Sequence, residues 1–365
     1  MKVGSTRAKI FKEDSELILS EMEKVFESKI LTQGPFVERF EKEFSKKFSV
    51  TAKAVNSGSS ALEIIMNLLP SNKEEVLLPA NTIYLDAAAI LKNSLRPVFY
   101  DVGENDFFPS LEQIKSKVTD NTAAIMVVHL GGFIPENIFE IKEFCESKGI
   151  ALIEDAAHAA GSKIKDIFAG SIGDFSAFSF FPTKIITSCE GGIVCCKDES
   201  LSEKVDSLRN QGLVGEKNEN FGYNYRMSEL HGIVGYHQIK RLDEFIAHRQ
   251  SIAKIYDAEI KSSTLTKMEF SSDCFPNFYK YPCTLNGANR MQVKEKMKEL
   301  DIVLTGEVYS VPCYKQPVFK DQEFYNETHG NADWICANHI CLPMDNNIEV
   351  EQAKYVAEKI NEVFP

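Results

Sequence analysis

The sequence predicts an α/β protein with a large domain, built on a mostly parallel central sheet, and a smaller α+β domain at its C-terminal end. Three observations lead to this fold class. Short apolar runs alternate with helical segments between about residues 50 and 200, one long amphipathic stretch follows, and a second, shorter set of strands and helices closes the chain. Alternation of strands and helices is typical of parallel sheets that are covered on both faces.

Six short apolar runs are the predicted strands of the central sheet. They lie at residues 76–78, 97–100, 123–128, 150–153, 175–180 and 192–195. Two further segments, 59–69 and 136–149, have the pattern of helices. In 59–69 the apolar side chains at positions 61, 62, 64, 65, 68 and 69 form one wide stripe, which predicts a helix that packs on the sheet.

The C-terminal third begins with a predicted long amphipathic helix over residues 226–250. Its apolar positions are Met227, Leu230, Ile233, Val234, Ile239, Leu242 and Phe245. After it we expect a strand at 281–285, a helix at 289–300, a strand at 302–304 and a helix at 349–362. Because single cores stop growing near ~250–300 residues, we expect two domains, a large one of residues 1–248 and a small one of residues 249–365.

Charge and composition narrow the class of protein. The formal net charge is −12, which disfavours nucleic acid and anionic membranes as partners. No apolar run reaches the ~20 residues of a membrane span, and the N-terminus has no long apolar stretch of a signal peptide. The nine cysteines show no paired framework, and Cys336, His339 and Cys341 have no second ligand cluster, so we expect a cytoplasmic protein with reduced thiols and no metal.

Three features at predicted strand ends carry the chemistry, and the first is 55-VNSGSSALEII-65. Small residues here open a helix, and Ser60 and Glu63 have the spacing of a capping box. Free N–H groups at a helix start, with Gly58 allowing close approach and the hydroxyls of Ser57 and Ser59 adding donors, predict an anion site. The alternative is a plain helix cap without a ligand.

The second feature is 151-ALIEDAAHAAG-161. A buried strand ends in Glu154 and Asp155, and His158 follows. A carboxylate at such a place needs a cationic or hydrogen-bonding partner, and a protonated ring nitrogen would supply one. The alternatives are an aspartate that caps the next helix and a structural histidine.

The third feature is 174-DFSAFSFFPTKIITSCEGGIV-194, in which Lys184 is the one amine among many apolar residues. Desolvation makes a lysine a nucleophile toward carbonyl groups, whereas the alternative is a surface or helix-end lysine. An anion cradle, a strand-end carboxylate and an isolated amine on one sheet match what pyridoxal 5′-phosphate requires. The phosphate needs the cradle, the pyridine nitrogen needs the acid, and the aldehyde needs the amine.

The chain resembles the DegT/DnrJ/StrS-type pyridoxal-phosphate-dependent nucleotide-sugar aminotransferases. The resemblance covers nearly the whole chain. It rests on 31-LTQGPFVERFEKEF-44, 56-NSGSSAL-62, 79-PANT-82, 128-VHLGG-132, 153-IEDAAHAAG-161, 178-FSFFPTK-184, 190-EGG-192, 222-GYNYRM-227 and 342-LPM-344. It implies the fold type I, aspartate-aminotransferase-like architecture and pyridoxal 5′-phosphate as cofactor, with pyridoxamine phosphate as its aminated form.

The resemblance also implies roles for three candidate catalytic residues. Lys184 is similar to the lysine that forms the Schiff base with the cofactor, and it would then serve as general base. Asp155 is similar to the partner of the pyridine nitrogen. His158 stands where the family has a Gln or His near the phenolic oxygen of the cofactor.

Four further positions are similar to cofactor-binding residues of the family. Gly58 and Ser59 match the Gly-Thr of the phosphate cradle, and Ser179 matches the serine five residues before the lysine. Asn224 matches an asparagine that reaches the cofactor phosphate of the partner subunit. The resemblance therefore implies a homodimer with shared active sites.

The sequence departs from the family pattern at three places. Many members have an aromatic residue directly after the Thr of 79-PANT-82, and here Ile83 stands there with Tyr84 next, so either could pack on the cofactor ring. Cys189 replaces a common glycine. Gly131 replaces a residue that is usually aromatic, a change that opens the substrate side of the site.

These observations predict an aminotransferase that moves an amino group, with L-glutamate as the implied donor, to a nucleotide-linked keto sugar. The ending Glu190-Gly191-Gly192 favours a 4-keto over a 3-keto sugar. The alternatives on the same scaffold are a sugar dehydratase, a cyclitol aminotransferase and a non-catalytic regulatory member. Intact Lys184, Asp155 and Ser179 argue against the last, and the absence of G-x-G-x-x-G and P-loop motifs argues against a nucleotide-binding α/β domain.

Overall fold

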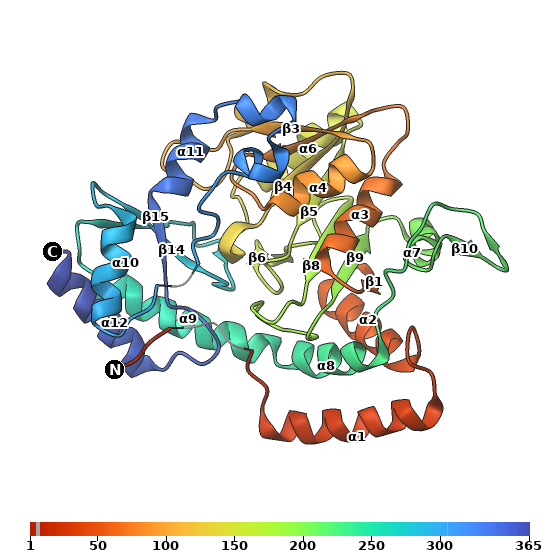
Figure 1. Cartoon of the computed structure of the whole chain (residues 1–365), viewed down its shortest axis with the longest axis horizontal. Coiled ribbons are helices and arrows are strands. Elements are labelled where there is room, and N and C mark those ends of the chain that lie inside the picture. The colour runs from red at the N-terminus through yellow and green to blue at the C-terminus, as the bar shows by residue number, and fades with distance from the viewer. Residues whose placement is uncertain (5–7, 305) are drawn as a thin grey trace.

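A computed structural model of the chain describes residues 1–4, 8–304 and 306–365. Its centre is a seven-stranded sheet (Figure 1). The strand order is β1 (Thr51–Val55), β9 (Gly192–Cys196), β8 (Phe175–Ser179), β5 (Ala151–Asp155), β4 (Thr122–Val128), β2 (Glu75–Pro79) and β3 (Arg96–Tyr100). Neighbours from β8 to β3 are parallel, whereas β9 runs antiparallel to both β8 and β1, so the predicted fold class is confirmed.

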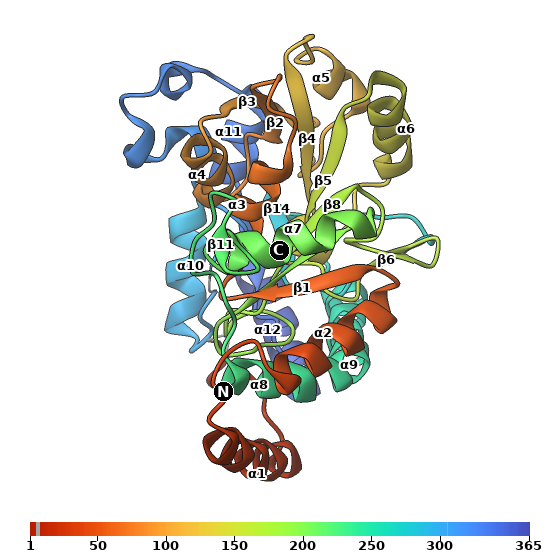
Figure 2. The same ribbon diagram turned by 90° about the vertical axis from the view of Figure 1, so that its right-hand side faces the viewer.

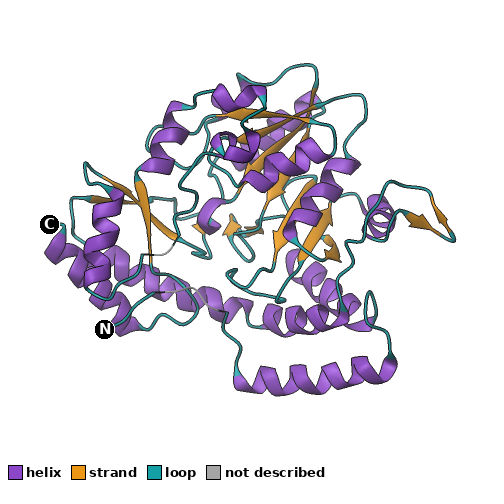
Figure 3. Ribbon diagram, viewed as in Figure 1, coloured by secondary structure: helices purple, strands orange, loops and turns teal. Residues whose placement is uncertain are grey.

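Helices cover both faces of this sheet, as Figure 3 shows. The flanking helices are α2 (Pro35–Phe48), α3 (Gly58–Leu68), α4 (Tyr84–Lys92), α5 (Leu111–Lys115), α6 (Ile138–Lys148) and α7 (Ser202–Arg209). Alternate residues of one strand point to opposite faces, so Val76 of β2 packs with α3 and α4 while Leu77 packs with α5 and α6. The six predicted strands and both predicted helices of this region are confirmed, and β1 is an additional edge strand that the apolar runs did not predict.

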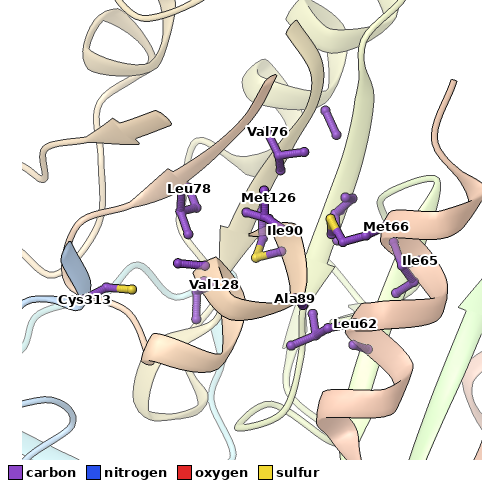
Figure 4. Close-up of a cluster of buried hydrophobic side chains, with 14 of the residues drawn as sticks. Leu62, Ile65, Met66, Val76, Leu78, Ala89, Ile90, Met126, Val128 and Cys313 are labelled. Atoms are coloured by element: carbon purple, nitrogen blue, oxygen red, sulfur yellow. The ribbon is translucent and has the colours of Figure 1, made fainter. Parts of the chain in front are cut away.

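A fully buried cluster joins α3 and α4 to the sheet (Figure 4). Leu62 and Ile65 of α3 and Ile90 of α4 lie against Val76 of β2 and Met126 of β4. Burial of each large apolar side chain contributes about 1.5–3 kcal/mol. This packing fixes the start of α3, and with it the predicted anion cradle, against the ends of the strands.

The expected long helix over residues 226–250 is instead two helices that lie end to end, so this prediction was wrong in its continuity (Figure 1). They are α8 (Glu229–Lys240) and α9 (Leu242–Glu259). Arg241 between them has φ −90° and ψ −4°, and its N–H donates to carbonyls three and two residues back. Its guanidinium binds Asp14 of α1 (Lys12–Ser28) at 2.9 Å, an interaction that no local pattern reveals.

The C-terminal part has its own sheet and core. The antiparallel order is β12 (Leu265–Lys267), β14 (Tyr281–Leu285) and β15 (His339–Leu342), with α10 (Arg290–Glu299) and α12 (Val350–Val363) in the same core. The buried residues of α11 (Gly330–Ala337) instead join the core cluster of the central sheet. The strand expected at 302–304 is not formed. In its place, Ile302 makes an isolated bridge to Val3. The predicted boundary at residue 248 falls within α9, and the division into two domains stays a prediction.

Short elements complete the chain. A small sheet has the order β13 (Cys274–Phe275), β6 (Lys163–Ile164) and β7 (Ile167–Phe168), and single turns of 3₁₀ helix lie at Leu130–Gly132, Glu199–Leu201, Cys313–Lys315, Pro317–Phe319 and Glu323–Asn326. The hairpin of β10 (Leu213–Val214) and β11 (Lys217–Asn218) projects at the right of Figure 1 and faces the viewer in Figure 2.

Within the residues that the structure describes, no helix is long and apolar enough to cross a membrane. The same described part of the chain contains no group of three or more His, Cys, Asp or Glu side chains that could hold a metal ion. His339, which stands between Cys336 and Cys341 in the sequence, accepts a hydrogen bond from the N–H of Val308 at 3.1 Å and lies 2.6 Å from the carbonyl of Ile335. Its two ring nitrogens therefore have structural partners.

Candidate active site

The carboxyl ends of the parallel strands bring the predicted site residues to one edge of the sheet. In the strand register, Val128 at the end of β4 pairs with Asp155 at the end of β5, and Asp155 pairs with Ala177 of β8. The loops that follow these strands carry His129, His158 and Lys184. Ligands of open α/β sheets bind at this edge, so the strand topology explains why residues far apart in the sequence meet here.

Asp155 is a buried carboxylate without a counter-cation in contact. It is 4% exposed, its Oδ1 accepts the N–H of Ala157 at 3.0 Å, and no ion pair to it occurs among the described residues. Burial raises the pKa of Asp155, while the Ala157 N–H and the charge of Lys184 act in the opposite direction. A cationic ring nitrogen placed against this carboxylate would relieve its desolvation.

A buried pair of side chains, His129 and Glu154, lies next to Asp155 at the end of β5. His129 Nε2 lies 2.7 Å from Glu154 Oε2, and both side chains are fully buried. Glu154 also accepts N–H bonds from Gly170, Ile172 and Gly173 at 2.8, 2.7 and 2.6 Å. Burial alone would raise the pKa of Glu154, but these bonds, led by that to His129, lower it. Glu154, whose neighbour is Asp155, thus ties the end of β5 to His129 and to residues 170–173, contacts that its place in the sequence did not reveal.

His158 lies between two tyrosines that no sequence motif singled out. Its ring centre is 4.3 Å from that of Tyr279 and 5.9 Å from that of Tyr309. Its Nε2 is 3.4 Å from the Tyr309 hydroxyl, and its Nδ1 is 3.4 Å from the N–H of Gly131. Burial, with the charges of Lys184 and Lys280, holds the pKa of His158 well below its usual value, so the ring is neutral near pH 7.

Lys184 is half-buried, and its amine lies over the ring of Tyr279. The distance from Nζ to the ring centre is 4.9 Å, and the Tyr279 hydroxyl is 3.2 Å from Oγ1 of Thr183. Burial alone would raise the pKa of Tyr279, but the charges of Lys184 and Lys280 lower it. The apolar neighbours in the sequence enclose the amine less than expected, because Phe181 is 44% exposed.

The backbone at Lys184 is tied to the C-terminal part of the chain. Asn346 donates its Nδ2 to the carbonyl of Ile185 at 2.8 Å, and its Oδ1 accepts from Nε of Arg249. Arg249 is almost completely buried and also donates to the carbonyl of Phe278, next to Tyr279, at 3.0 Å. One hydrogen-bonded network therefore sets both Lys184 and the aromatic ring beside it.

The start of α3 differs from the predicted capping box. Ser57 caps the helix by accepting the N–H of Ser60 at 3.1 Å, so the helix begins at Gly58, earlier than expected. Glu63 does not reach back to the helix start; instead it binds Lys92 at 2.6 Å and the hydroxyl of Tyr225. The N–H groups of Ser60 and Ala61 bond back to Ser57.

Gly58 lies against the end of β8. A Cβ on Gly58 would come within 2.9 Å of Cβ of Ser179, so a larger residue would push the helix away from the strand. Ser59 is half-buried beside it, and Ser179 Oγ lies 3.5 Å from the N–H of Phe181. The structure therefore brings Gly58 and Ser59, predicted for the phosphate cradle, next to Ser179, a further predicted cofactor-binding residue.

Tyr84 and Asn224 are both exposed. Tyr84 is 43% exposed at the start of α4, and Ile83 before it is half-buried, so which of them packs on a cofactor ring stays open. Asn224 is exposed, and its carbonyl accepts from Asn56 Nδ2 at 3.2 Å. Its side chain is thus presented outward from a loop whose backbone is anchored beside the start of α3.

The two other departures from the family pattern, Cys189 and Gly131, lie at backbone positions with positive φ. Cys189 has φ +69°, in the left-handed region that favours glycine, and this explains why glycine is common at the position. Gly131 has φ +65° and forms a turn directly after His129.

A cavity of about 270 Å³ lies beside Tyr84 and Tyr309. It is lined by Thr82, Ile83, Tyr84, Gly306, Glu307, Val308, Tyr309, Ser310, Val311 and Gln316. Tyr309 connects this cavity with the site residues, because its hydroxyl lies 3.4 Å from Nε2 of His158. A further carboxyl, Asp86, is fully buried near Asp155 and accepts a hydrogen bond from the Thr82 hydroxyl, and burial followed by the charge of Asp155 raises its pKa well above the ordinary value.

Known proteins are similar to this chain over nearly its whole length. The model of the DegT/DnrJ/EryC1/StrS aminotransferase family matches residues 12–361. The chain is 31% identical to GDP-perosamine synthase of Escherichia coli O157:H7 over 341 residues, which cover 92% of each protein. It is 28% identical to dTDP-4-dehydro-2,3,6-trideoxy-D-glucose 4-aminotransferase of Saccharopolyspora spinosa, over 93% of this chain and 92% of that one.

A solved structure has the same fold. It belongs to a Streptococcus pneumoniae protein described as a sugar aminotransferase and solved in a PLP form. The TM-score is 0.90 at 22% identity, and the alignment covers 100% of this chain and 98% of the other. At this identity the likeness supports the fold.

Proposed function

Because the chain belongs to the DegT/DnrJ/EryC1/StrS aminotransferase family, we propose that it aminates the keto group at carbon 4 of a nucleotide-linked sugar with L-glutamate as donor. The chain is a pyridoxal-phosphate-dependent aminotransferase of the nucleotide-sugar class. The observation that supports the aminotransferase chemistry is that Lys184 follows β8, Asp155 ends the neighbouring β5, and the start of α3 packs against the end of β8.

The residues present fit the cofactor. Asp155 offers a buried carboxylate that lacks a counter-cation among the described residues, and this suits a protonated pyridine nitrogen. The first turn of α3, with Ser57 and Ser59, offers N–H and hydroxyl groups to a phosphate. Bound pyridoxal phosphate supplies an aldehyde that accepts an amino group and a ring that stabilises negative charge on the attached carbon.

Lys184 and the residues around it would control proton movement. The amine of Lys184 would hold the cofactor through its aldehyde and, when free, would act as the general base toward the α-carbon proton of the donor. Asp155 keeps the ring nitrogen protonated throughout. His158, neutral near pH 7, can donate a hydrogen bond to an oxygen of the ring without adding a second positive charge beside Lys184.

Two considerations support carbon 4 as the site of amination. The Saccharopolyspora spinosa relative is named as a 4-aminotransferase, and the Glu190-Gly191-Gly192 segment has the pattern that favours this position. The cavity beside His158 is open to the surface rim at Tyr84, which suits a substrate that carries a bulky nucleotide outside.

A homodimer is part of the proposal. Asn224 is exposed on a loop, together with the outward side chains of Phe221 and Tyr223, which are 85% and 59% exposed. If a second copy covered this loop, Asn224 of the first copy would reach the cofactor phosphate in the site of the second copy, as the family resemblance implies. We also propose that the enzyme works in the cytoplasm, where its nucleotide-sugar substrates would be present.

The test is product analysis with defined substrates. The pyridoxal-phosphate-loaded protein is incubated with L-glutamate and a panel of 3-keto and 4-keto sugars linked to GDP, dTDP or UDP, and mass spectrometry follows replacement of the keto oxygen by an amino group. The proposal expects an amino sugar with nitrogen at carbon 4, located by NMR, and no product from Lys184→Ala. A product that lacks nitrogen, or nitrogen at carbon 3, would contradict it.

A further inference from the structure

Lys280 is a second amine at the site, and neither the family pattern nor the chemistry above assigns it a role. It directly precedes β14, and its N–H donates to the carbonyl of Gly131 at 3.0 Å. Its Nζ lies 5.4 Å from the centre of the Tyr279 ring, the same ring that lies 4.9 Å from Nζ of Lys184. The two amines therefore share one aromatic neighbour.

The side chain of Lys280 passes close to two glycines, Gly131 and Gly306. A Cβ on Gly131 would lie 3.7 Å from Cβ of Lys280 and 3.4 Å from the ring of Phe133, so a large side chain at this position would crowd the lysine stem. A Cβ on Gly306 would lie 3.4 Å from Nζ of Lys280. Because Gly306 lines the cavity of about 270 Å³, the amine reaches the wall of that cavity.

The charge of Lys280 has no counter-charge in contact within the described part of the chain. Glu307 is the acidic residue of the cavity lining, and it is already bound by Lys294 at 2.7 Å and faces Arg290 at 4.0 Å. Lys280 is half-buried, and its charge contributes to lowering the pKa values of both Tyr279 and His158. In a protein of net charge −12, an unpaired cation at the substrate cavity indicates an anionic ligand.

We propose that Lys280 binds a carboxylate of the amino donor. This proposal rests on the proposed function, because it names the group that recognises the donor at the same site. The ammonium group of lysine is a compact charge with three N–H donors, which suits a carboxylate that must arrive and leave in every cycle.

Two anions could reach Lys280, the donor carboxylate and the diphosphate of the nucleotide sugar. The α-carboxylate of an amino acid is two bonds from the nitrogen that is transferred, so it must lie near Lys184. The diphosphate is attached to carbon 1, across the sugar ring from a keto group at carbon 4. Because Lys280 and Lys184 flank one ring, the donor carboxylate fits the position of Lys280 better.

The experiment compares wild type, Lys280→Met and Lys280→Arg, each loaded with pyridoxal phosphate. Binding of glutarate, a dicarboxylate without an amine, is measured by calorimetry, and the loss of the cofactor absorption band with L-glutamate is followed by stopped flow. We expect Lys280→Met to weaken glutarate binding and to raise the glutamate concentration at half-maximal rate by roughly 10- to 100-fold, the range of a lost charge-assisted hydrogen bond, and Lys280→Arg to recover part of it.

Lys296→Met is the matched control, because Lys296 also lies 5.4 Å from an aromatic ring, that of Phe364, but on α10. Equal glutarate binding in wild type and Lys280→Met overturns the proposal. A defect of Lys280→Met confined to the reaction of the aminated enzyme with a keto-sugar nucleotide also overturns it and assigns the lysine to the diphosphate. If glutamate leaves the wild-type band unchanged, the proposed function fails, while the glutarate arm still decides the role of Lys280.

Discussion

The ε-amine of Lys184 lies 4.9 Å from the ring centre of Tyr279, a residue of another part of the chain, and the Tyr279 hydroxyl lies 3.2 Å from Oγ1 of Thr183. The amine to which we assign the Schiff-base role thus has an aromatic neighbour whose pKa it lowers. This relationship links the strand-end lysine to the C-terminal part through the network of Arg249 and Asn346.

Tyr279→Phe tests that link. The charges of Lys184 and Lys280 lower the pKa of Tyr279, so loss of its hydroxyl removes a group that titrates on the alkaline side of the pH profile. We expect kcat to fall about fivefold, as for a lost hydrogen bond of ~1 kcal/mol, and the alkaline limb of the kcat profile to move to higher pH. The control is Tyr281→Phe, whose hydroxyl binds Asp257. An unchanged pH profile in Tyr279→Phe would show that the Tyr279 hydroxyl does not set the alkaline limb.

Asp155→Asn tests the partner of the ring nitrogen. An amide cannot hold a cationic nitrogen by charge, so we expect the variant to bind cofactor but to lose about 100-fold in kcat/KM for L-glutamate. Asp86→Asn is a matched control, because Asp86 is also a fully buried carboxyl, whose pKa burial raises well above the ordinary value, but it accepts its hydrogen bond from the Thr82 hydroxyl. Wild-type rates in Asp155→Asn would exclude the assigned role.

Asn224→Ala tests the shared active site. If Asn224 completes the site of the partner subunit, Asn224→Ala and Lys184→Ala should each be inactive alone. Mixed and allowed to exchange subunits, they should recover about a quarter of the wild-type activity, since half of the dimers then contain one intact site. Activity that stays absent in the mixture, with heterodimers verified by two affinity tags, would place Asn224 in the site of its own chain.

Glu154→Gln tests the buried pair behind Asp155. The bonds to His129 and three N–H groups lower the pKa of Glu154, so its contribution to folding is present above the ordinary glutamate pKa of about 4.3 and is lost as pH falls through the lower folded-state value. We expect the free energy of unfolding to drop by about 3 kcal/mol at pH 7 and the difference from wild type to shrink below pH ~4.

Urea unfolding at the two pH values measures this difference. Glu146→Gln on the exposed side of α6 is the control and should change stability little, because its contact with Lys197 at 3.9 Å is exposed. A difference between Glu154→Gln and wild type that is the same at both pH values would contradict the pairing of Glu154 with His129.

The sequence was most informative for candidate site residues that end a strand or follow closely after one. Asp155 ends β5 and Lys184 follows β8, so the apolar periodicity of the chain is enough to place both residues at strand ends. The sequence could not show Tyr279, which meets Thr183 only through a contact that spans 96 residues. Lys280 is hidden for the same reason, since its partners Gly131 and Gly306 lie in two separate loops.

Predictions from local sequence patterns were wrong at two places where tertiary contacts are made. The amphipathic pattern continues through Arg241, but the helix breaks there, where the side chain binds Asp14 of α1. The Ser60–Glu63 spacing suited a capping box, yet Ser57 caps the helix and Glu63 binds Lys92 and Tyr225. In both cases the competing partner comes from a distant segment.

The role of Lys184 can be tested by a visible absorption scan of the protein with pyridoxal phosphate, before and after L-glutamate, with Lys184→Ala as control. We expect a band near the visible edge that is absent in Lys184→Ala, disappears with glutamate and returns with 2-oxoglutarate. A wild-type band that persists unchanged with glutamate would contradict the proposed donor, and identical spectra of wild type and Lys184→Ala would contradict the central role of Lys184.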